Sequence, residues 1–107
     1  MAKKTSATPT DNVLRDLGFP DAEELSAKVM LALKINQLLD ARALNQTKAA
    51  QLLEMPQPKV SAIRNYRLRG ISLERLMQAL IALDQSVEII VRHRRPRAHG
   101  GIVVAAE

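Results

Sequence analysis

Residues 46–65, QTKAAQLLEMPQPKVSAIRN, carry the most specific structural signal in this chain. Asn45 is a good N-cap for a short helix over residues 46–53, because its side-chain oxygen can accept a hydrogen bond from a first-turn N–H. The tight connection EMP (54–56) then leads to a second short helix. Pro58 stands near the start of that helix, where a missing N–H does no harm because first-turn donors have no intrahelical partner. The stretch therefore predicts two short helices, the second reaching roughly residue 65.

The two short helices share an apolar side that can join them to longer helices. Its members are Ala49, Leu53, Met55, Val60 and Ile63. Ala50 is small where the two helices cross, so their backbones can approach closely. The remaining face of the second helix is polar and carries Gln57, Lys59, Ser61 and Arg64. This pattern has the outline of a helix-turn-helix, whose second helix enters the major groove of DNA.

Charge separates this interpretation from the alternative, an αα-corner in an ordinary helical bundle. The alternative explains the apolar pattern, but it does not explain the basic block that begins at the second helix. Residues 57–75 hold five Lys or Arg against one Glu, a net charge of +4, within a chain of net charge +5. Base edges offer hydrogen-bond donors and acceptors, whereas phosphates attract Lys and Arg. The sequence pI of about 10.1 also favours a polyanion as partner.

The flanking sequence predicts a mainly α fold, a compact helical bundle around the helix-turn-helix. A short helix is expected over 11–17. We expect Phe19-Pro20 to interrupt helical structure. Asp21 then resembles an N-cap for a long helix that runs to about residue 43. The apolar face of that long helix should hold Leu31, Ile35, Leu38 and Leu39. Ser72 should cap a further helix over 73–83, whose apolar stripe is Leu73, Leu76, Met77, Leu80, Ile81 and Leu83.

At residues 84–85 the hydrophobic period changes from 3.6 to 2, which predicts a β-strand over 86–93. A lone strand exposes a full edge of unpaired N–H and C=O groups. Its partner is either the tail segment 102–105, in a hairpin, or the same strand of a second chain about a two-fold axis. We favour the second, because two recognition helices one DNA turn (~34 Å) apart require a dimer. The residues expected in this dimer strand are Val87, Ile89, Ile90 and Val91.

Length and composition set the frame for these elements. The 107 residues make one domain, which we divide into a flexible arm (1–10), the helix-turn-helix domain with its dimerisation strand (11–93) and a basic tail (94–107). No segment fits a signal peptide or a membrane span, so a cytoplasmic protein is expected. There is no Cys or Trp, and only one Phe and one Tyr. Disulfides, Cys-ligated zinc and aromatic platforms for single-stranded nucleic acid are therefore excluded.

Chemistry at a catalytic centre is not expected. The sequence has no nucleophile–base pair, no Gly-rich phosphate loop and no cofactor motif. His93 and His99 stand without a cluster of carboxylates around them, so a metal site is not predicted either. The terminal run 92–97 (RHRRPR) could contact phosphates beside the groove or serve as a solvated tail.

Several motifs resemble known families, over about residues 13–93. NQTKAAQLL (45–53) and QPKVS (57–61) look like the helix-turn-helix of the Cro/cI-type (XRE) family. LGFPDAEEL (17–25), SLERL (72–76) and VEIIVR (87–92) are similar to HigA-type antitoxins. The resemblance implies a small bacterial regulator that represses its own operon as a dimer on double-stranded DNA. It also implies a protein partner, a RelE/HigB-like ribonuclease toxin encoded beside it, which the chain would neutralise.

The resemblance also assigns roles to residues. Gln57 begins the recognition helix and should read a base edge, most simply adenine through its amide. The base-reading set it implies is Gln57, Pro58, Lys59, Ser61 and Ala62. The phosphate-binding set is Gln46 and Lys48, in the first turn of the preceding helix, with Arg64, Arg67 and Arg69 on the flanking backbone.

The chain departs from the family pattern at the turn. Glu54 stands where the family usually has Gly, so a positive φ at this residue would cost about 1 kcal/mol. Pro56 replaces the usual Ser, Thr or Asp cap and cannot cap through its side chain.

The sequence leaves two functions open, an antitoxin with a toxin partner and a regulator without one. Residues 13–25 are more apolar than a DNA-binding core requires, and toxin contacts are therefore expected at Leu14, Leu17 and Phe19. The alternative is a stand-alone XRE-family or phage-type regulator with the same DNA chemistry and no toxin.

Overall fold

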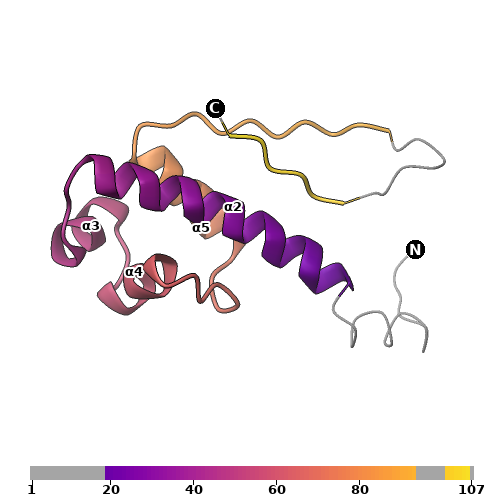
Figure 1. Ribbon diagram of the computed structural model, residues 1–107. Coiled ribbons are helices and arrows are strands. Elements are labelled where there is room, and N and C mark those ends of the chain that lie inside the picture. The colour runs from indigo at the N-terminus through magenta and orange to yellow at the C-terminus, as the bar shows by residue number, and fades with distance from the viewer. Residues whose placement is uncertain (1–18, 94–100, 107) are drawn as a thin grey trace.

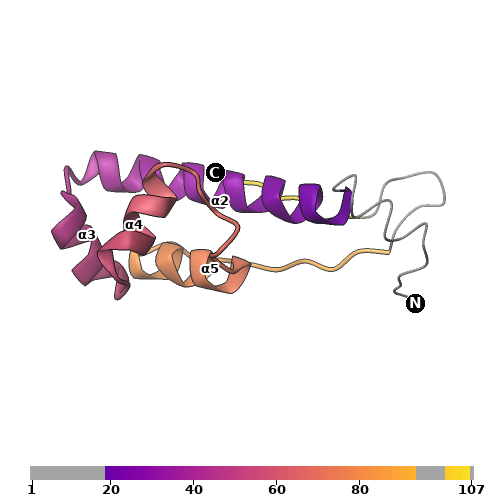
Figure 2. The ribbon, with the colours of Figure 1, turned by 90° about the horizontal axis from the view of Figure 1, so that it is seen from below.

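A long helix and a shorter one lie side by side and carry the rest of the fold. The computed structural model describes residues 19–93 and 101–106. The long helix α2 covers Phe19–Ala41, and α5, Leu73–Ala82, packs along it. The two short helices α3, Gln46–Leu53, and α4, Gln57–Arg64, pack on each other and against this pair (Figures 1 and 2). The mainly α bundle with two short consecutive helices is thus confirmed.

Local capping explains where the short helices begin. The Asn45 side-chain oxygen accepts a hydrogen bond from the Lys48 N–H at 2.8 Å. Ser72 Oγ accepts from the Arg75 N–H at 3.0 Å, which starts α5 where the sequence predicts. Pro56 precedes α4 without a side-chain cap, and Pro58 lies in the first turn. The bounds of α3 and α4 therefore agree with the prediction from residues 46–65.

The start of α2 corrects the prediction. The helix begins at Phe19, so Asp21 lies inside its first turn and is not the N-cap. Phe19-Pro20 does not interrupt the helix but belongs to its first turn. A proline is tolerated there because the N–H that it lacks would have no intrahelical acceptor. The other end of α2 is residue 41, two residues short of the expected boundary.

The core lies between all four helices. Its members with no more than a few percent of their surface exposed include Ile35, Leu39, Met55, Val60, Ile63, Leu68, Leu76 and Leu83. The apolar set predicted for the two short helices is buried throughout. Ile81 is the exception in α5: it is 57% exposed, and Ala79 is buried instead. Positions 76, 79, 80 and 83 recur at helical spacing on one face, and position 81 falls outside it.

The expected strand over 86–93 is not formed in this single chain. The structure assigns no strand to any residue it describes. Residues 86–93 run as an extended segment toward the N-terminal end of α2 (Figures 1 and 2). Val87 is partly buried against the core, whereas Ile89 is 75% and Val91 91% exposed. A strand requires a partner for its N–H and C=O groups. The alternative partner, 102–105, forms no strand pairing. Its Val104 instead packs against the core.

Some expectations fall outside the described residues. These are the arm 1–10, the short helix 11–17 with Leu14 and Leu17, and the basic run 94–97 with His99. Within the part that is described, no helix combines the length and the apolar character needed to cross a bilayer.

Candidate nucleic-acid interface

The N-terminal ends of α3 and α4 meet at one place on the surface. Gln57, the first residue of α4, directs its amide Nε2 to the hydroxyl of Thr47 in the first turn of α3, at 3.4 Å. Gln46 and Lys48 in that same turn are exposed. First-turn N–H groups and the helix dipole make such a place favourable for an anion such as a phosphate. The predicted base reader and two predicted phosphate ligands are therefore neighbours.

The outer edge of α4 is polar along its length. Gln57 and Pro58 are exposed, and Ser61 is partly exposed one turn later. Asn65 follows after another turn, and its amide Nδ2 donates to the Ser61 carbonyl at 2.9 Å. Val60 and Ile63 on the opposite edge are completely buried. This edge thus presents amides and a hydroxyl, the groups that can exchange hydrogen bonds with base edges.

Two of the predicted base-reading residues lie beside this polar edge and contact other parts of the protein. The Lys59 ammonium donates to the Gly70 carbonyl at 2.9 Å, and so contacts the loop after α4. Ala62 is half-buried and packs against the core. In the predicted base-reading set, Gln57 and Pro58 are therefore exposed, Lys59, Ser61 and Ala62 are partly exposed, and the Lys59 ammonium is engaged with the loop.

Arg64 is bound within the protein. Its guanidinium donates to Asp40 Oδ1 at 2.6 Å and to Asn36 Oδ1 at 3.1 Å, both on α2. Buried Asn36 in turn donates to the Ile63 carbonyl at 3.0 Å, near the C-terminal end of α4 where carbonyls lack intrahelical partners. These bonds fix α4 on α2. The structure therefore places Arg64 apart from the exposed cations of the predicted phosphate set.

The turn between α3 and α4 is built on a left-handed residue. Glu54 has φ 54° and ψ 47°, the conformation in which a side chain is disfavoured, so the condition for strain at this residue is met. The Met55 N–H donates to the Ala50 carbonyl at 3.1 Å, and the Glu54 carbonyl accepts from Arg75 Nη2 at 3.2 Å. The turn is therefore held by backbone bonds and by α5 in spite of the missing glycine.

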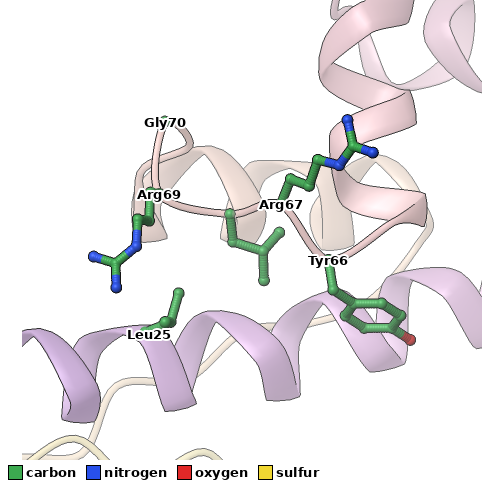
Figure 3. A pocket seen from close by; sticks show the side chains of 6 residues that line it. Leu25, Tyr66, Arg67, Arg69 and Gly70 are labelled. Atoms are coloured by element: carbon green, nitrogen blue, oxygen red, sulfur yellow. The ribbon is translucent and has the colours of Figure 1, made fainter.

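The loop 66–70 supplies two further exposed cations. Arg67 and Arg69 are exposed on either side of buried Leu68. With Tyr66 and with Leu25 of α2 they line a shallow, open hollow (Figure 3). Figure 3 shows the Arg67 guanidinium directed toward α4 and that of Arg69 directed toward the N-terminal half of α2. Arg67 therefore extends the surface of α4, whereas Arg69 lies farther along the loop.

Two polar residues of this surface are not predicted by the sequence pattern. Thr47 was hidden because it lies next to Lys48 and Gln46, and only the folded turn brings its hydroxyl to Gln57. The sequence pattern ends α4 near Asn65, and the signal that indicates its place on the same edge is its spacing of four residues from Ser61. Among the described residues, no three His, Cys, Asp or Glu side chains cluster closely enough to hold a metal ion.

Comparison with known proteins supports this arrangement. A family model for a helix-turn-helix domain matches residues 13–92. A solved structure described as an XRE-family transcriptional regulator is 52% identical to this chain, with a TM-score of 0.75. The match covers 82% of this chain and all of the other. A search of curated proteins gave no match.

Proposed function

The chain belongs to the XRE family of helix-turn-helix proteins, and from that premise we propose that it is a transcriptional regulator that reads double-stranded DNA with α4. In this proposal α4 lies in the major groove with its polar edge toward the bases, and α3 crosses the phosphate backbone.

One observation carries the proposal: the exposed amide of Gln57 stands where the first turns of α3 and α4 meet. A glutamine amide can donate to N7 and accept from N6 of adenine at once, which distinguishes this base from the other three. Ser61 follows one turn along the same edge. Gln46 and Lys48 are suitably exposed for a backbone phosphate, and Arg67 for the next one.

The repressor acts as a dimer in this proposal. The segment 86–93 supports it, because its backbone has no strand partner within the described chain and Ile89, Ile90 and Val91 are exposed. Antiparallel pairing with a second copy satisfies the backbone, and Val87, already partly buried, begins the paired stretch. The pairing also sets the separation of the two copies of α4 on DNA.

We further propose that the protein is an antitoxin that neutralises a RelE/HigB-like ribonuclease and represses its own operon. The support is the similarity of residues 17–25, 72–76 and 87–92 to HigA-type antitoxins. Phe19 opens α2, next to the apolar segment that contains Leu14 and Leu17. A regulator without a toxin would bind DNA through the same residues. The product of the neighbouring reading frame distinguishes the antitoxin from the stand-alone regulator.

The DNA-binding proposal is tested by affinity for three nucleic acids at several salt concentrations: the chain's own promoter region, a random duplex and an RNA of equal length. We expect the promoter to bind best, typically by 10³-fold or more over random duplex. Equal affinity for both duplexes, or a preference for RNA, overturns the proposal.

The antitoxin proposal is tested by purification together with the product of the adjacent reading frame. Removal of residues 1–18 leaves α2 whole, and we expect it to abolish toxin binding while promoter binding persists. Loss of both activities, or of neither, rejects the assignment of toxin contacts to this segment. Failure of the full chain to bind the neighbouring product favours the stand-alone regulator.

A further inference from the structure

A buried lysine on α2 has no part in the interface described so far. Lys28 is only 6% exposed, in the half of α2 that lies opposite the loop 66–70. Lysine is rarely buried, because removing its ammonium from water is costly unless the charge is paired and hydrogen-bonded. Here Nζ pairs with Glu24 at 3.2 Å and donates to the backbone carbonyl of Leu68, also at 3.2 Å.

The carbonyl that Lys28 contacts lies at the centre of the basic loop. The Leu68 side chain is buried, and its two neighbours in sequence are the exposed Arg67 and Arg69. Two residues on, the Gly70 carbonyl accepts from Lys59 of α4 at 2.9 Å. Besides its backbone hydrogen bonds, such as that from the Arg67 N–H to the Ala62 carbonyl at 2.8 Å, the loop is therefore held by one ammonium from α2 and one from α4. Loops without such bonds are usually the more mobile parts of a fold.

We propose that Lys28 is a positioning residue for phosphate binding, which it serves by fixing the loop that presents Arg67 and Arg69. The inference rests on the proposed binding of DNA. Its physical reason is preorganisation: an arginine on a fixed backbone loses less conformational freedom when it binds a phosphate than one on a moving loop. Lys28 itself does not reach the duplex, since its ammonium is enclosed and shared between Glu24 and Leu68.

Lys28→Met tests the proposal in the full chain, because it removes the ammonium and keeps most of the apolar stem. The fold should survive: the Leu68 carbonyl still accepts from the Ile71 N–H at 3.1 Å, and the Glu24 side chain is half exposed. We expect affinity for promoter and random duplex to fall by the same factor, on the order of tenfold for one charged hydrogen bond. The slope of log K against log salt should become shallower by about one per subunit, as for a lost phosphate contact.

Arg42→Met is the matched control. Arg42 directly follows the last residue of α2, donates to a backbone carbonyl (Leu83, 3.0 Å) and pairs with a carboxylate (Asp84, 2.9 Å), at the end of the helix far from the loop. A loss of α2 contacts in general should affect both variants alike. We expect Arg42→Met to leave the salt slope unchanged.

A double-mutant cycle with Arg67→Gln decides whether Lys28 acts through the arginine. We expect Arg67→Gln to weaken binding clearly in the wild-type chain and much less in Lys28→Met. Additive losses, or an unchanged salt slope in Lys28→Met, overturn the proposal. If Lys28→Met and the shorter Lys28→Gln both fail to fold, the lysine is a folding determinant and the proposal is likewise overturned. If Arg67→Gln has no effect in the wild type, the proposed phosphate contact itself fails.

Discussion

At the scale of single residues, Glu54 shows how the turn is formed without its customary glycine. Its left-handed backbone is disfavoured for a residue with a Cβ, yet the chain adopts it because α3 and α4 both pack into the core on either side. The hydrogen bond from Arg75 to the Glu54 carbonyl further fixes the turn.

Glu54→Gly is therefore expected to raise the free energy of unfolding by about 1 kcal/mol, since glycine adopts this conformation without steric cost. Urea denaturation measures the effect: the midpoint should rise, while the dependence of the free energy of unfolding on urea concentration should stay the same. Glu54→Ala is the control, because alanine removes the carboxylate and keeps the strain. A gain of the same size for alanine contradicts the backbone explanation.

Gln57 decides sequence reading in this account. We expect Gln57→Ala to weaken binding to the promoter by about 1–3 kcal/mol and to relax the preference at one base position. Binding to random duplex should change little. Gln37→Ala, an exposed glutamine on α2, serves as the control. Equal losses on promoter and random duplex reject base reading by this side chain.

At the scale of elements, α4 is placed by polar contacts that a hydrophobic pattern does not reveal. The apolar positions 60 and 63 determine which edge is buried, but Asn36, Asp40 and Arg64 fix the C-terminal end of α4 on α2. Two arginines three residues apart therefore have different tasks: Arg64 holds the element, whereas Arg67 is exposed beside it.

This difference is open to measurement. Arg64→Met should lower the free energy of unfolding by about 1–2 kcal/mol, since part-buried hydrogen bonds to Asn36 are lost, and should leave the salt slope unchanged. Arg67→Ala should leave stability within about 0.5 kcal/mol. Its binding to all duplexes should weaken similarly, with a salt slope shallower by about one per subunit. A loss of stability in Arg67→Ala together with a shallower salt slope in Arg64→Met contradicts these separate roles.

The elements that sequence predicts well are those with local signals. Asn45 and Ser72 begin α3 and α5 by hydrogen bonds to residues three positions on, so their positions follow from sequence alone. The apolar spacing of α4 also predicts its buried edge, and Gln57 is exposed outside that edge. The hydrogen bonds from Arg64 to Asp40, from Lys59 to Gly70 and from Lys28 to Leu68 join residues 11 to 40 positions apart, and no local pattern predicts such pairs.

At the scale of the whole molecule, the segment 86–93 has a strand-like sequence pattern that a single copy of the chain leaves unpaired. Its alternation of apolar residues predicts a strand, and in a single copy the backbone is extended with no ladder. Three consecutive exposed apolar side chains, at positions 89–91, are unusual for a surface that stays in water. Spacing rules predict the alternation of the segment but do not identify its partner strand, and pairing with a second copy belongs to the proposed function.

Ile90→Pro should reduce the molecule to a monomer, because proline removes a ladder hydrogen bond and fixes φ in the paired stretch. Sedimentation should give twice the chain mass for the wild type and the chain mass for the variant. Helical content should not change, since α2 to α5 lie outside the segment. A wild-type monomer at the concentrations where it binds the promoter contradicts pairing through these residues.

The central claim is that the polar edge of α4 enters the groove of a duplex. Nuclear magnetic resonance of the ¹⁵N-labelled chain, titrated with a duplex of its own promoter, tests this most directly. The account predicts the largest amide shift changes at residues 46–48, 57–62 and 66–70, with small changes at Val29, Met30 and Leu33 on the outer face of α2. Large changes on that outer face, with the amides of α4 unmoved, would contradict it.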